Sequence, residues 1–497
     1  MKGYILKRLL RSLLSILVII TAVFIMVYSL VPRDNIFKND DTFRKLSAKP
    51  DDKTDYIMRT WQNIGYLDYQ NMSYYCTGLY GEATDETRAC VLAGSKESKE
   101  FVDLYESKGY TVKYFINGAP YAYKDLPVIS RLASWFGNMI QIDHPWKVKD
   151  ETNPDLERRL YFGTTPTGGV ALKCSGCEYK YQIYTDSRFP FIHQNILTVY
   201  LGESYPTYKG LKILDVIFDT QGQEVKKTVT FETGQTGESS IMFGTCRYKS
   251  VLDRLDQNKF TDHYASCMHK KATPSMVGIS FIMGIFSIII AYALGLPIGL
   301  AMARNKDKLI DKLGMVYIIF IIAVPSLAYI YIFRYLGTTL FGLPSAFPTL
   351  GAEDIRSWIL PVISLALPSI SGLMLWMRRY AVDQMSSDYV KFAKSKGLNQ
   401  HEIFKNHILK NAIIPIAQGI PASLASCIVG AIITEAIYSV GGMGKMLPDA
   451  IKQYNNAMVL ALTFMFAGIS IISVLLGDLI LIWLDPRISL TEKEGRN

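Results

Sequence analysis

The chain has 497 residues, of which 49% are hydrophobic and 20% charged, a mixture too apolar for an ordinary soluble enzyme. Its net charge of +9 lies outside residues 33–271, within which 31 basic and 31 acidic residues balance. These numbers argue against a fibrous protein, a disordered chain or a nucleic-acid-binding protein with a basic domain. They predict a membrane protein that carries one large, neutral insertion.

The first uncharged run, Ser12–Val31, is long enough to cross a ~30 Å hydrocarbon core as a helix. Four basic residues precede this run, and Pro32-Arg33-Asp34 follows it in place of a small-residue cleavage site. We therefore expect residues 1–34 to form an N-terminal segment and an uncleaved transmembrane helix rather than a signal peptide.

Sustained hydrophobicity returns only after residue 273, in the last part of the chain. Five further apolar runs lie there, at Pro274–Ala303, Leu313–Phe333, Trp358–Met377, about 413–440 and Ala457–Leu484. The sequence thus predicts six transmembrane helices, the last five of them within residues 274–490, and a short tail over 491–497.

The distribution of lysine and arginine predicts the orientation of these helices. With a cytoplasmic N-terminus, the four inner segments hold eighteen basic residues and the two short outer loops hold four. Because basic residues are retained on the cytoplasmic side, we expect both termini to be cytoplasmic and residues 35–273 to be outside the cell.

Six of the seven cysteines lie in this outer insertion, where oxidising conditions permit disulfides. They allow fifteen pairings, among which the sequence does not choose. A Cys-x-x-Cys motif also occurs in redox and zinc sites, but no second motif and no histidine at ligand spacing accompany this one. We therefore predict structural disulfides and no metal, with these candidates: Cys76, Cys90, Cys174, Cys177, Cys246 and Cys267.

The insertion is predicted to be a mixed α/β domain. Asn117-Gly118 separates Thr111–Ile116 from Ala119–Lys124, a pattern typical of a two-residue β-hairpin. Tyr179–Thr185 and Lys226–Glu232 alternate in the manner of strands. Because its histidines are scattered, the sequence indicates no catalytic constellation in this domain, and its role stays open.

The most informative segment is the predicted inner loop at 378–415. Ser386 or Ser387 can begin a helix whose small apolar face is Tyr389, Phe392 and Ala393, and Gly397 can end it in a left-handed cap.

Asn399 and Glu402 then have the spacing of a reciprocal N-terminal cap for a second short helix, which carries Ile403, Phe404 and Ile408. Such a pair of helices can dock into a groove on a cytosolic partner. It can equally lie on the lipid surface through its basic residues, and physical chemistry alone leaves both interpretations open.

A family resemblance favours the first interpretation. Asp388–Leu398, together with Asn411–Pro415, resembles the "EAA" loop of bacterial ABC importer permeases of the oligopeptide branch. Glu435–Leu447 resembles the acidic-aromatic-glycine signature of that branch, and residues 4–10 and 484–488 resemble its usual start and end. The chain departs from the pattern at Lys391 and Phe392, which occupy the first "E-A" positions, and in a displaced proline.

The resemblance implies an all-α membrane core of six helices, the type I ABC importer fold, with a mixed α/β extracellular domain between helices 1 and 2. It implies a permease subunit that passes oligopeptides from an external binding lipoprotein into the cytoplasm. The implied partners are a second permease subunit, as a heterodimer, and two cytosolic subunits that bind ATP and Mg.

The chain itself contains no G-x-x-x-x-G-K-[ST] phosphate-binding loop, so we expect it not to be an enzyme. By the same resemblance the residues that couple transport to ATP hydrolysis are Asp388, Tyr389, Phe392, Ala393, Gly397, Glu402, Phe404 and Pro415.

Two acidic residues fall within predicted transmembrane helices. An ionisable group inside the bilayer is costly and usually faces an aqueous path or the bundle interior, so we assign Glu435 to the translocation pathway or its outer gate. Asp478 is predicted to be a helix-packing or interface residue. Gly295 and Gly299 are expected to permit close helix packing.

Two alternatives remain at this level. The same machine can carry nickel or another small solute, because the membrane core does not encode substrate size. A membrane-anchored receptor or adhesin with a functional outer domain is a different class, which the structured loop at 378–415 argues against because an anchor needs only one transmembrane helix.

Overall fold

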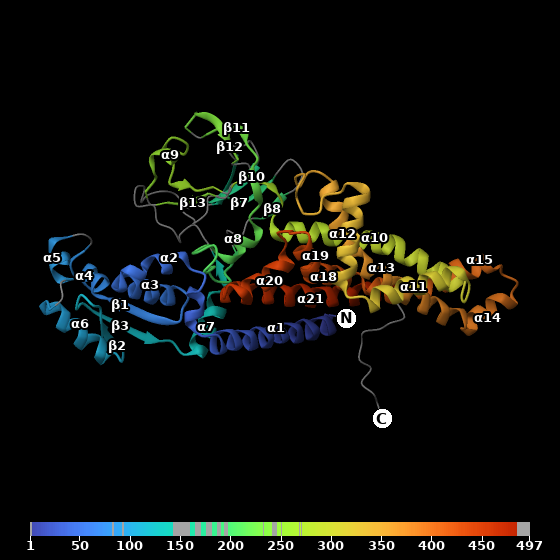
Figure 1. The fold of residues 1–497 in the computed structure, drawn as a ribbon, viewed down its shortest axis with the longest axis horizontal. Helices are drawn as coiled ribbons and strands as arrows, with labels where there is room; N and C mark the ends of the chain where they lie inside the picture. Colours follow the sequence, from blue (N-terminus) through green and yellow to red (C-terminus); the bar gives the residue numbers. More distant parts are fainter. Residues whose placement is uncertain are drawn as a thin grey trace, which may run out of the picture.

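The computed structural model describes residues 2–484 except 82–83, 92–93, 143–159, 165–169, 175–180, 186–189, 193–196, 232, 241–245, 250, 268 and 270. Figure 1 shows an elongated molecule with a lobe of residues 34–125 at one end and residues 388–403 at the other. Long helices occupy the space between these ends.

Four of those helices are long and apolar enough to cross a membrane. They are α1 (Lys2–Leu30), α10 (Met276–Arg304), α13 (Arg356–Met385) and α21 (Asn456–Leu484). Two bent helix pairs raise the number of candidate spans to six if each pair crosses once. The four helices coincide with four of the six predicted runs, so a helical membrane core is confirmed.

The prediction of one continuous helix over 313–333 is wrong. Helix α11 (Leu309–Ala323) ends two residues before α12 (Ser326–Phe341), and the two helices meet at 114°. Pro325 explains the break, because proline lacks an amide hydrogen and disfavours helical backbone at the residue before it.

The segment predicted as the fifth span is also divided. It consists of α17 (Ile414–Gln418), α18 (Ile420–Gly430) and α19 (Ile432–Ile437), followed by α20 (Met443–Lys452). The chain bends by 41° at Gly419, and Pro421 lies in the first turn of the next helix. Consecutive short helices thus take the place of the single continuous helix that was predicted.

Helices α10 and α13 form the closest pair in the core. A Cβ atom on Gly299 would lie 2.7 Å from the carbonyl oxygen of Met374, and one on Gly295 would lie 2.8 Å from Leu373 Cβ. The expected role of these glycines in close helix packing is therefore confirmed.

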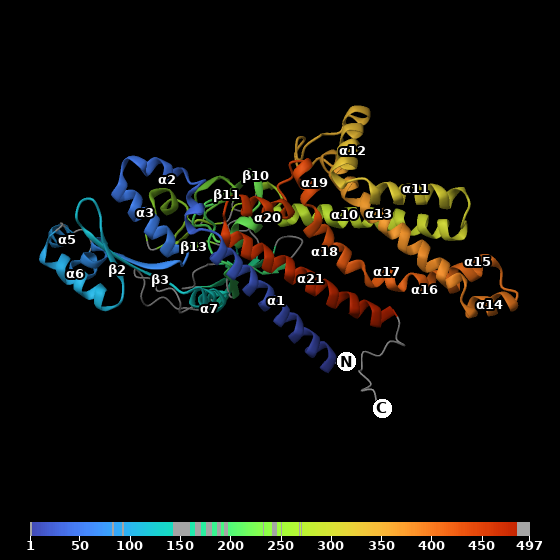
Figure 2. The same ribbon diagram turned by 60° about the horizontal axis from the view of Figure 1, so that its bottom comes forward.

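The first and last helices lie side by side in both ribbon views (Figures 1 and 2). Ile20 and Phe24 of α1 are buried, and Arg8 of α1 forms an ion pair with Asp478 of α21. The predicted packing role of Asp478 is consistent with this inter-helix contact.

Residues 33–273 contain short helices and small antiparallel sheets. The helices are η1 (Arg33–Phe37), α2 (Asp41–Lys45), η2 (Leu46–Ala48), α3 (Pro50–Asn63), α4 (Met72–Tyr80), α5 (Asp85–Cys90), α6 (Lys96–Ser107), α7 (Val128–Asn138), α8 (Ile213–Phe218) and α9 (Arg254–Gln257).

A three-stranded sheet of order β1-β3-β2 organises the lobe, and a four-stranded sheet of order β5-β6-β7-β8 lies further along the chain. The strands are β1 (Leu67–Asn71), β2 (Thr111–Tyr114), β3 (Pro120–Asp125), β4 (Ile140–Ile142), β5 (Leu160–Thr164), β6 (Val170–Cys174), β7 (Tyr181–Thr185), β8 (Pro190–Ile192), β9 (Leu197–Val199), β10 (Gln221–Glu224), β11 (Lys227–Thr230), β12 (Thr236–Ser239), β13 (Arg247–Tyr248), β14 (Tyr264–Ala265) and β15 (Lys271–Thr273).

The predicted β-hairpin is present, but its loop has three residues, 116–118, instead of the predicted two, because the Phe115 amide donates to Ala119 O. β2 pairs with β3, with Tyr114 opposite Pro120, and Gly118 in the turn has a φ of 81°. Within the predicted strands at 179–185 and 226–232 lie β7 and β11, while residues 179, 180 and 232 fall outside the described residues.

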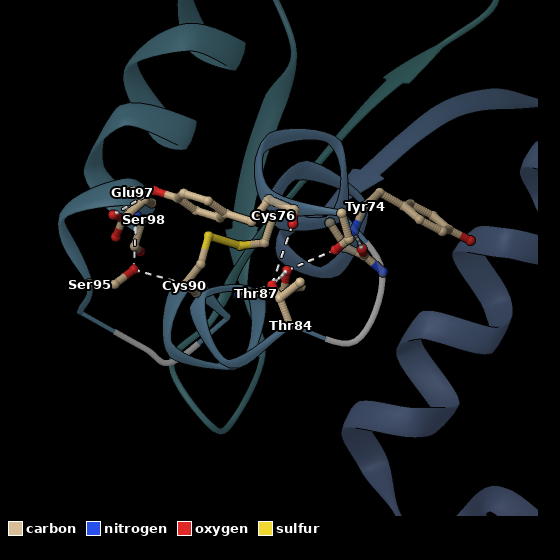
Figure 3. The surroundings of a disulfide bond; sticks show 11 residues. Tyr74, Cys76, Thr84, Thr87, Cys90, Ser95, Glu97 and Ser98 are labelled. Atoms are coloured by element: carbon tan, nitrogen blue, oxygen red, sulfur yellow. Dashed lines mark hydrogen bonds between the residues drawn. A yellow bond between two sulfur atoms is a disulfide. The ribbon is translucent and has the colours of Figure 1, made fainter.

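Among the described residues, two disulfides connect four of the six predicted cysteines. Cys76 bonds to Cys90, joining α4 to α5 beside the caps of α5 and α6 (Figure 3), and Cys246 bonds to Cys267. Cys174 ends β6, whereas its predicted neighbour in the motif, Cys177, lies outside the described residues. Over the described part of the chain, no group of three His, Cys, Asp or Glu side chains is placed to hold a metal ion.

A buried carboxylate holds the base of the lobe. Asp40 has no exposed surface and accepts hydrogen bonds from the hydroxyls of Tyr56 and Tyr205, from the Lys209 ammonium and from the Thr42 amide at the start of α2. Burial alone would raise the pKa of this carboxyl, but the hydrogen bonds from Lys209, Tyr205 and Tyr56 outweigh it and lower the pKa to about 2.

Candidate functional site

The segment after α13 folds as two short helices joined at a glycine. Helix α14 (Asp388–Ser395) ends in a Schellman motif, in which the amide of Gly397 donates to Lys394 O at 3.0 Å and that of Leu398 to Ala393 O at 3.4 Å. Gly397 has a φ of 80°, which glycine adopts without strain. The predicted left-handed cap is confirmed.

The predicted reciprocal cap of the second helix is also confirmed. Helix α15 (Gln400–Ile403) begins at Asn399, whose side chain accepts from the Glu402 amide at 2.8 Å. The Glu402 carboxylate accepts from the Asn399 amide at 3.2 Å. Because both helix ends are fixed by their own hydrogen bonds, the angle between α14 and α15 is locally specified.

The start of α14 differs from the prediction. Ser387 occupies the N-cap position, but its hydroxyl donates to Gln384 O at 2.6 Å instead of accepting from the helix. Asp388 at the first helical position pairs with Lys391 at 2.8 Å, and its negative charge suits the positive end of the helix dipole. Tyr389 donates its hydroxyl to Gln384 Oε1.

The buried face of α14 is not the predicted one. Val390 and Ala393 are buried, whereas Tyr389 is 37% exposed and Phe392 is 61% exposed. Sequence reasoning missed Val390, although its spacing of three from Ala393 is helical. Of the predicted apolar face, the fold brings only Ala393 into the core.

That inner face belongs to one hydrophobic cluster. Val390 and Ala393 pack with Ile403, with Ile408 of the π-helix η3 (Phe404–Leu409), and with Met377 and Ala381 of α13, while Phe404 is half-buried at the edge. The chain then continues through α16 (Lys410–Ala412) to Pro415, which is exposed in the first turn of α17. The loop is therefore attached to the end of α13 as a packed unit.

The outer side of the unit carries exposed apolar and basic side chains, which we call the α14 patch. Phe392 is its most exposed apolar residue, and the Lys396 ammonium lies 4.5 Å from the centre of its ring. The patch consists of Tyr389, Lys391, Phe392, Lys394, Lys396 and Leu398. An exposed aromatic residue on a rigid scaffold is typical of an anchor at a protein interface.

An ion pair that sequence reasoning did not identify fixes the neighbouring helices. Arg378 donates through Nε and Nη2 to the two oxygens of Asp311, at 2.5 and 2.7 Å. Asp311 is almost fully buried and also accepts from the Asp307 amide. This two-hydrogen-bond ion pair joins the start of α11 to α13, close to the segment that forms α14 and α15.

Glu435 is fully buried among three elements. Its Oε1 accepts from the Ser280 hydroxyl of α10 at 2.6 Å, and its Oε2 accepts from the Lys445 amide in the first turn of α20 at 2.7 Å. A Cβ atom on Gly442 would lie 2.2 Å from Oε1. The carboxylate thus holds α19, α10 and α20 together, and its predicted place in the pathway or outer gate stays a prediction.

Comparisons with known proteins agree with this arrangement. Residues 295–490 match the family described as "Binding-protein-dependent transport system inner membrane component". The chain is 39% identical, over the full length of both proteins, to the oligopeptide transport system permease protein AmiC of Streptococcus pneumoniae serotype 4. It is 30% identical to the dipeptide transport system permease protein DppB of Lactococcus lactis subsp. cremoris, over 43% of this chain and 69% of DppB.

Among solved structures, the crystal structure of an amino acid ABC transporter with histidines aligns with 43% of this chain and 92% of its own at 17% identity. The TM-score is 0.33, which is too low to support an inference about the fold. The full-length relative therefore carries the comparison, since it includes a counterpart of residues 33–273.

Proposed function

The chain belongs to the permeases of binding-protein-dependent peptide ABC importers, and from that premise we propose how its parts divide the work of transport. It is a multi-pass membrane protein and a transport subunit. We assign coupling to the α14 patch, substrate passage to the helical core, and an external role to residues 35–273.

The proposed topology has six transmembrane helices, with each bent pair crossing once, and both termini in the cytoplasm. Two observations support it: the lobe and the α14 patch lie at opposite ends of the long helices (Figure 1), and basic residues are concentrated in the segments on the patch side. In this orientation residues 35–273 form an extracellular mixed α/β domain.

We propose that the α14 patch docks into a groove on a cytosolic ATP-binding subunit. The observation that carries this proposal is the exposure of Phe392 on a helix whose end and onward turn are fixed by the Gly397 and Asn399 caps. A rigid element of this kind can transmit movement between two chains, whereas a surface-lying amphipathic helix would turn Phe392 into lipid. ATP and Mg would be bound by two such partner subunits and not by this chain.

The proposed assembly contains a second, similar permease subunit as a heterodimer and an external lipoprotein that delivers oligopeptides. The relatives are named as oligopeptide and dipeptide permeases, which supports peptide as the substrate class. Within the core, the hydrogen bonds of Glu435 with Ser280 and with the start of α20 connect helices that would have to separate if the pathway opened between them. This supports a role at the outer gate.

The test is peptide-stimulated ATP hydrolysis by the complete transporter reconstituted in vesicles. Phe392→Ala should reduce stimulation about tenfold or more, because interface anchors contribute about 2 kcal/mol or more. The matched control is Phe162→Ala, which removes another exposed phenylalanine, in β5. Normal stimulation in the Phe392 variant would refute docking through the patch.

A further inference from the structure

A cavity lies where the lobe meets the ends of the first and last membrane helices. It has a volume of about 560 Å³ and is lined by residues of α1, α3, α7, the segment 200–210 and the start of α21. Phe24 and Tyr28 come from the last turns of α1, and Ala457 comes from the first turn of α21. Because both helices are membrane-spanning candidates, the cavity lies at a membrane surface whichever way the chain is oriented.

The cavity contains a buried cation. Arg131 of α7 lines it and is only 8% exposed, and neither its Nε nor its Nη2 has a hydrogen-bond acceptor among the described residues. Its guanidinium also has a side-chain hydrogen bond with Tyr66, and its centre lies 4.3 Å from the centre of the Tyr28 ring and 4.0 Å from that of the Tyr66 ring. Burial lowers the pKa of Arg131 from its usual value, so an anion beside it would stabilise the charged form.

The other groups in the cavity add to this preference. The indole Nε1 of Trp135 is buried and also has no acceptor among the described residues. Lys209, a second cation of the lining, is engaged by Asp40, and Glu203, its acidic residue, is solvent-exposed. Arg131 and Trp135 therefore both line the cavity and both carry buried N–H donors that have no acceptor among the described residues.

One face of α7 makes the cavity reachable from the surface. Ser130, Ser134 and Asn138 recur at a spacing of four, line the cavity and are exposed. Nearby, the apolar side chains of Ile129, Ile140 and Ile142 are 81, 61 and 64% exposed. Helix α7 and the residues after it thus place exposed isoleucines and a tryptophan beside the end of the membrane helix α1. This combination is typical of a segment that lies on the lipid surface.

We propose that this cavity binds the phosphate of an anionic phospholipid, with Arg131 as its counter-ion and Trp135 as a second donor. The aromatic walls from Phe24 and Tyr28 suit the start of the acyl chains, and the small polar residues of α7 suit the headgroup. The site would hold α7 and the base of the lobe against the membrane. It rests on the membrane placement of α1 and α21 and is independent of what the transporter carries.

The test uses the complete transporter in detergent, titrated with phosphatidylglycerol or with zwitterionic phosphatidylcholine. Phosphatidylglycerol should raise the melting temperature of the wild type, and Arg131→Gln should weaken its apparent affinity about tenfold or more. Arg131→Lys, which keeps the charge but loses the fork, should give an intermediate affinity. Arg88→Gln is the matched control, because Arg88 is exposed on α5 away from the cavity.

Three outcomes would overturn the proposal: equal stabilisation of Arg131→Gln and the wild type, equal protection by soluble glycerol phosphate, or equal protection by a short peptide. The second would indicate an anion site without lipid and the third a peptide site. Should Arg131→Gln fail to fold, a photoactivatable phosphatidylglycerol can be crosslinked to the wild type. Adducts should then map to α7 and the outer turns of α1, and adducts confined to other helices would refute the site.

Discussion

The helical core and the insertion of residues 33–273 are held together by different means. In the core, α10 and α13 approach so closely that a Cβ on Gly299 would lie 2.7 Å from the Met374 carbonyl oxygen, and polar links such as Asp311–Arg378 add to this packing. In the part that the structure describes, the insertion has small sheets of two to four strands, two disulfides and the buried Asp40 cluster.

The environments explain the difference. Between membrane helices, lipid is as apolar as the side chains, so stability depends on close packing of small residues. Small sheets in water bury little apolar surface, and cross-links compensate for that in secreted domains. Packing changes should therefore damage the core, and loss of cross-links should damage the insertion.

The largest expected effect comes from removing the lobe's cross-link. The double variant Cys76→Ser/Cys90→Ser should lose about 2–4 kcal/mol of lobe stability, because the unfolded loop regains its freedom. Limited proteolysis should cut residues 72–107 faster while the helical core remains intact. Simultaneous collapse of the core would contradict the separation of the two regions.

Gly299→Ala tests the core. The new methyl group would meet the Met374 carbonyl oxygen at 2.7 Å, so α10 and α13 must separate, at a cost of about 1–3 kcal/mol. A lower melting temperature of the purified transporter would show this. Gly372→Ala is the control, since a Cβ there meets nothing within 4 Å and alanine favours the helix.

Gly397→Val should have a smaller effect on stability, about 1–2 kcal/mol, because no atom lies within 4 Å of the new Cβ and only the positive φ is strained. Its effect on coupling should be greater: peptide-stimulated ATP hydrolysis falls while peptide binding by the external receptor is unchanged. Gly397→Asn, which tolerates this backbone, should retain activity. Full activity of the valine variant would count against a fixed angle between α14 and α15.

The smallest expected effect is the loss of lobe stability at low pH. The folded pKa of Asp40 lies below its unfolded value, so its contribution to stability is complete above about pH 4 and is lost as the pH falls toward 2. Wild-type lobe stability, followed by tyrosine fluorescence, should fall across that window. Asp40→Asn should flatten this part of the profile, and an unchanged profile would refute the assignment.

Sequence reasoning succeeded where the determining contacts are local. The hydrogen bonds of the Gly397 and Asn399–Glu402 caps join residues close in the chain. Asn117-Gly118 correctly located the hairpin, although its loop is one residue longer than predicted. Hydropathy located the helices but not the 114° bend between α11 and α12, because it reports how apolar a segment is and not the direction in which the chain runs.

Other features depend on partners that are distant in the chain. Val390 rather than Phe392 faces inward because α13 and η3 lie on that side. Asp311 meets Arg378 67 residues later, and Glu435 meets Ser280 155 residues earlier. No local sequence pattern indicates either contact, so neither the Asp311–Arg378 ion pair nor the Glu435–Ser280 hydrogen bond was predicted.

The pairing of α1 with α21 has a consequence for biosynthesis. Arg8 and the buried face around Ile20 emerge first from the ribosome, yet their partner Asp478 is made almost last. The contact of α1 with α21 can therefore form only near the end of synthesis, whereas Tyr28 in the last turn of α1 can pack against Tyr66 and Arg131 much earlier. A chain that stops before α21 would lack the Arg8–Asp478 ion pair that joins the first and last helices.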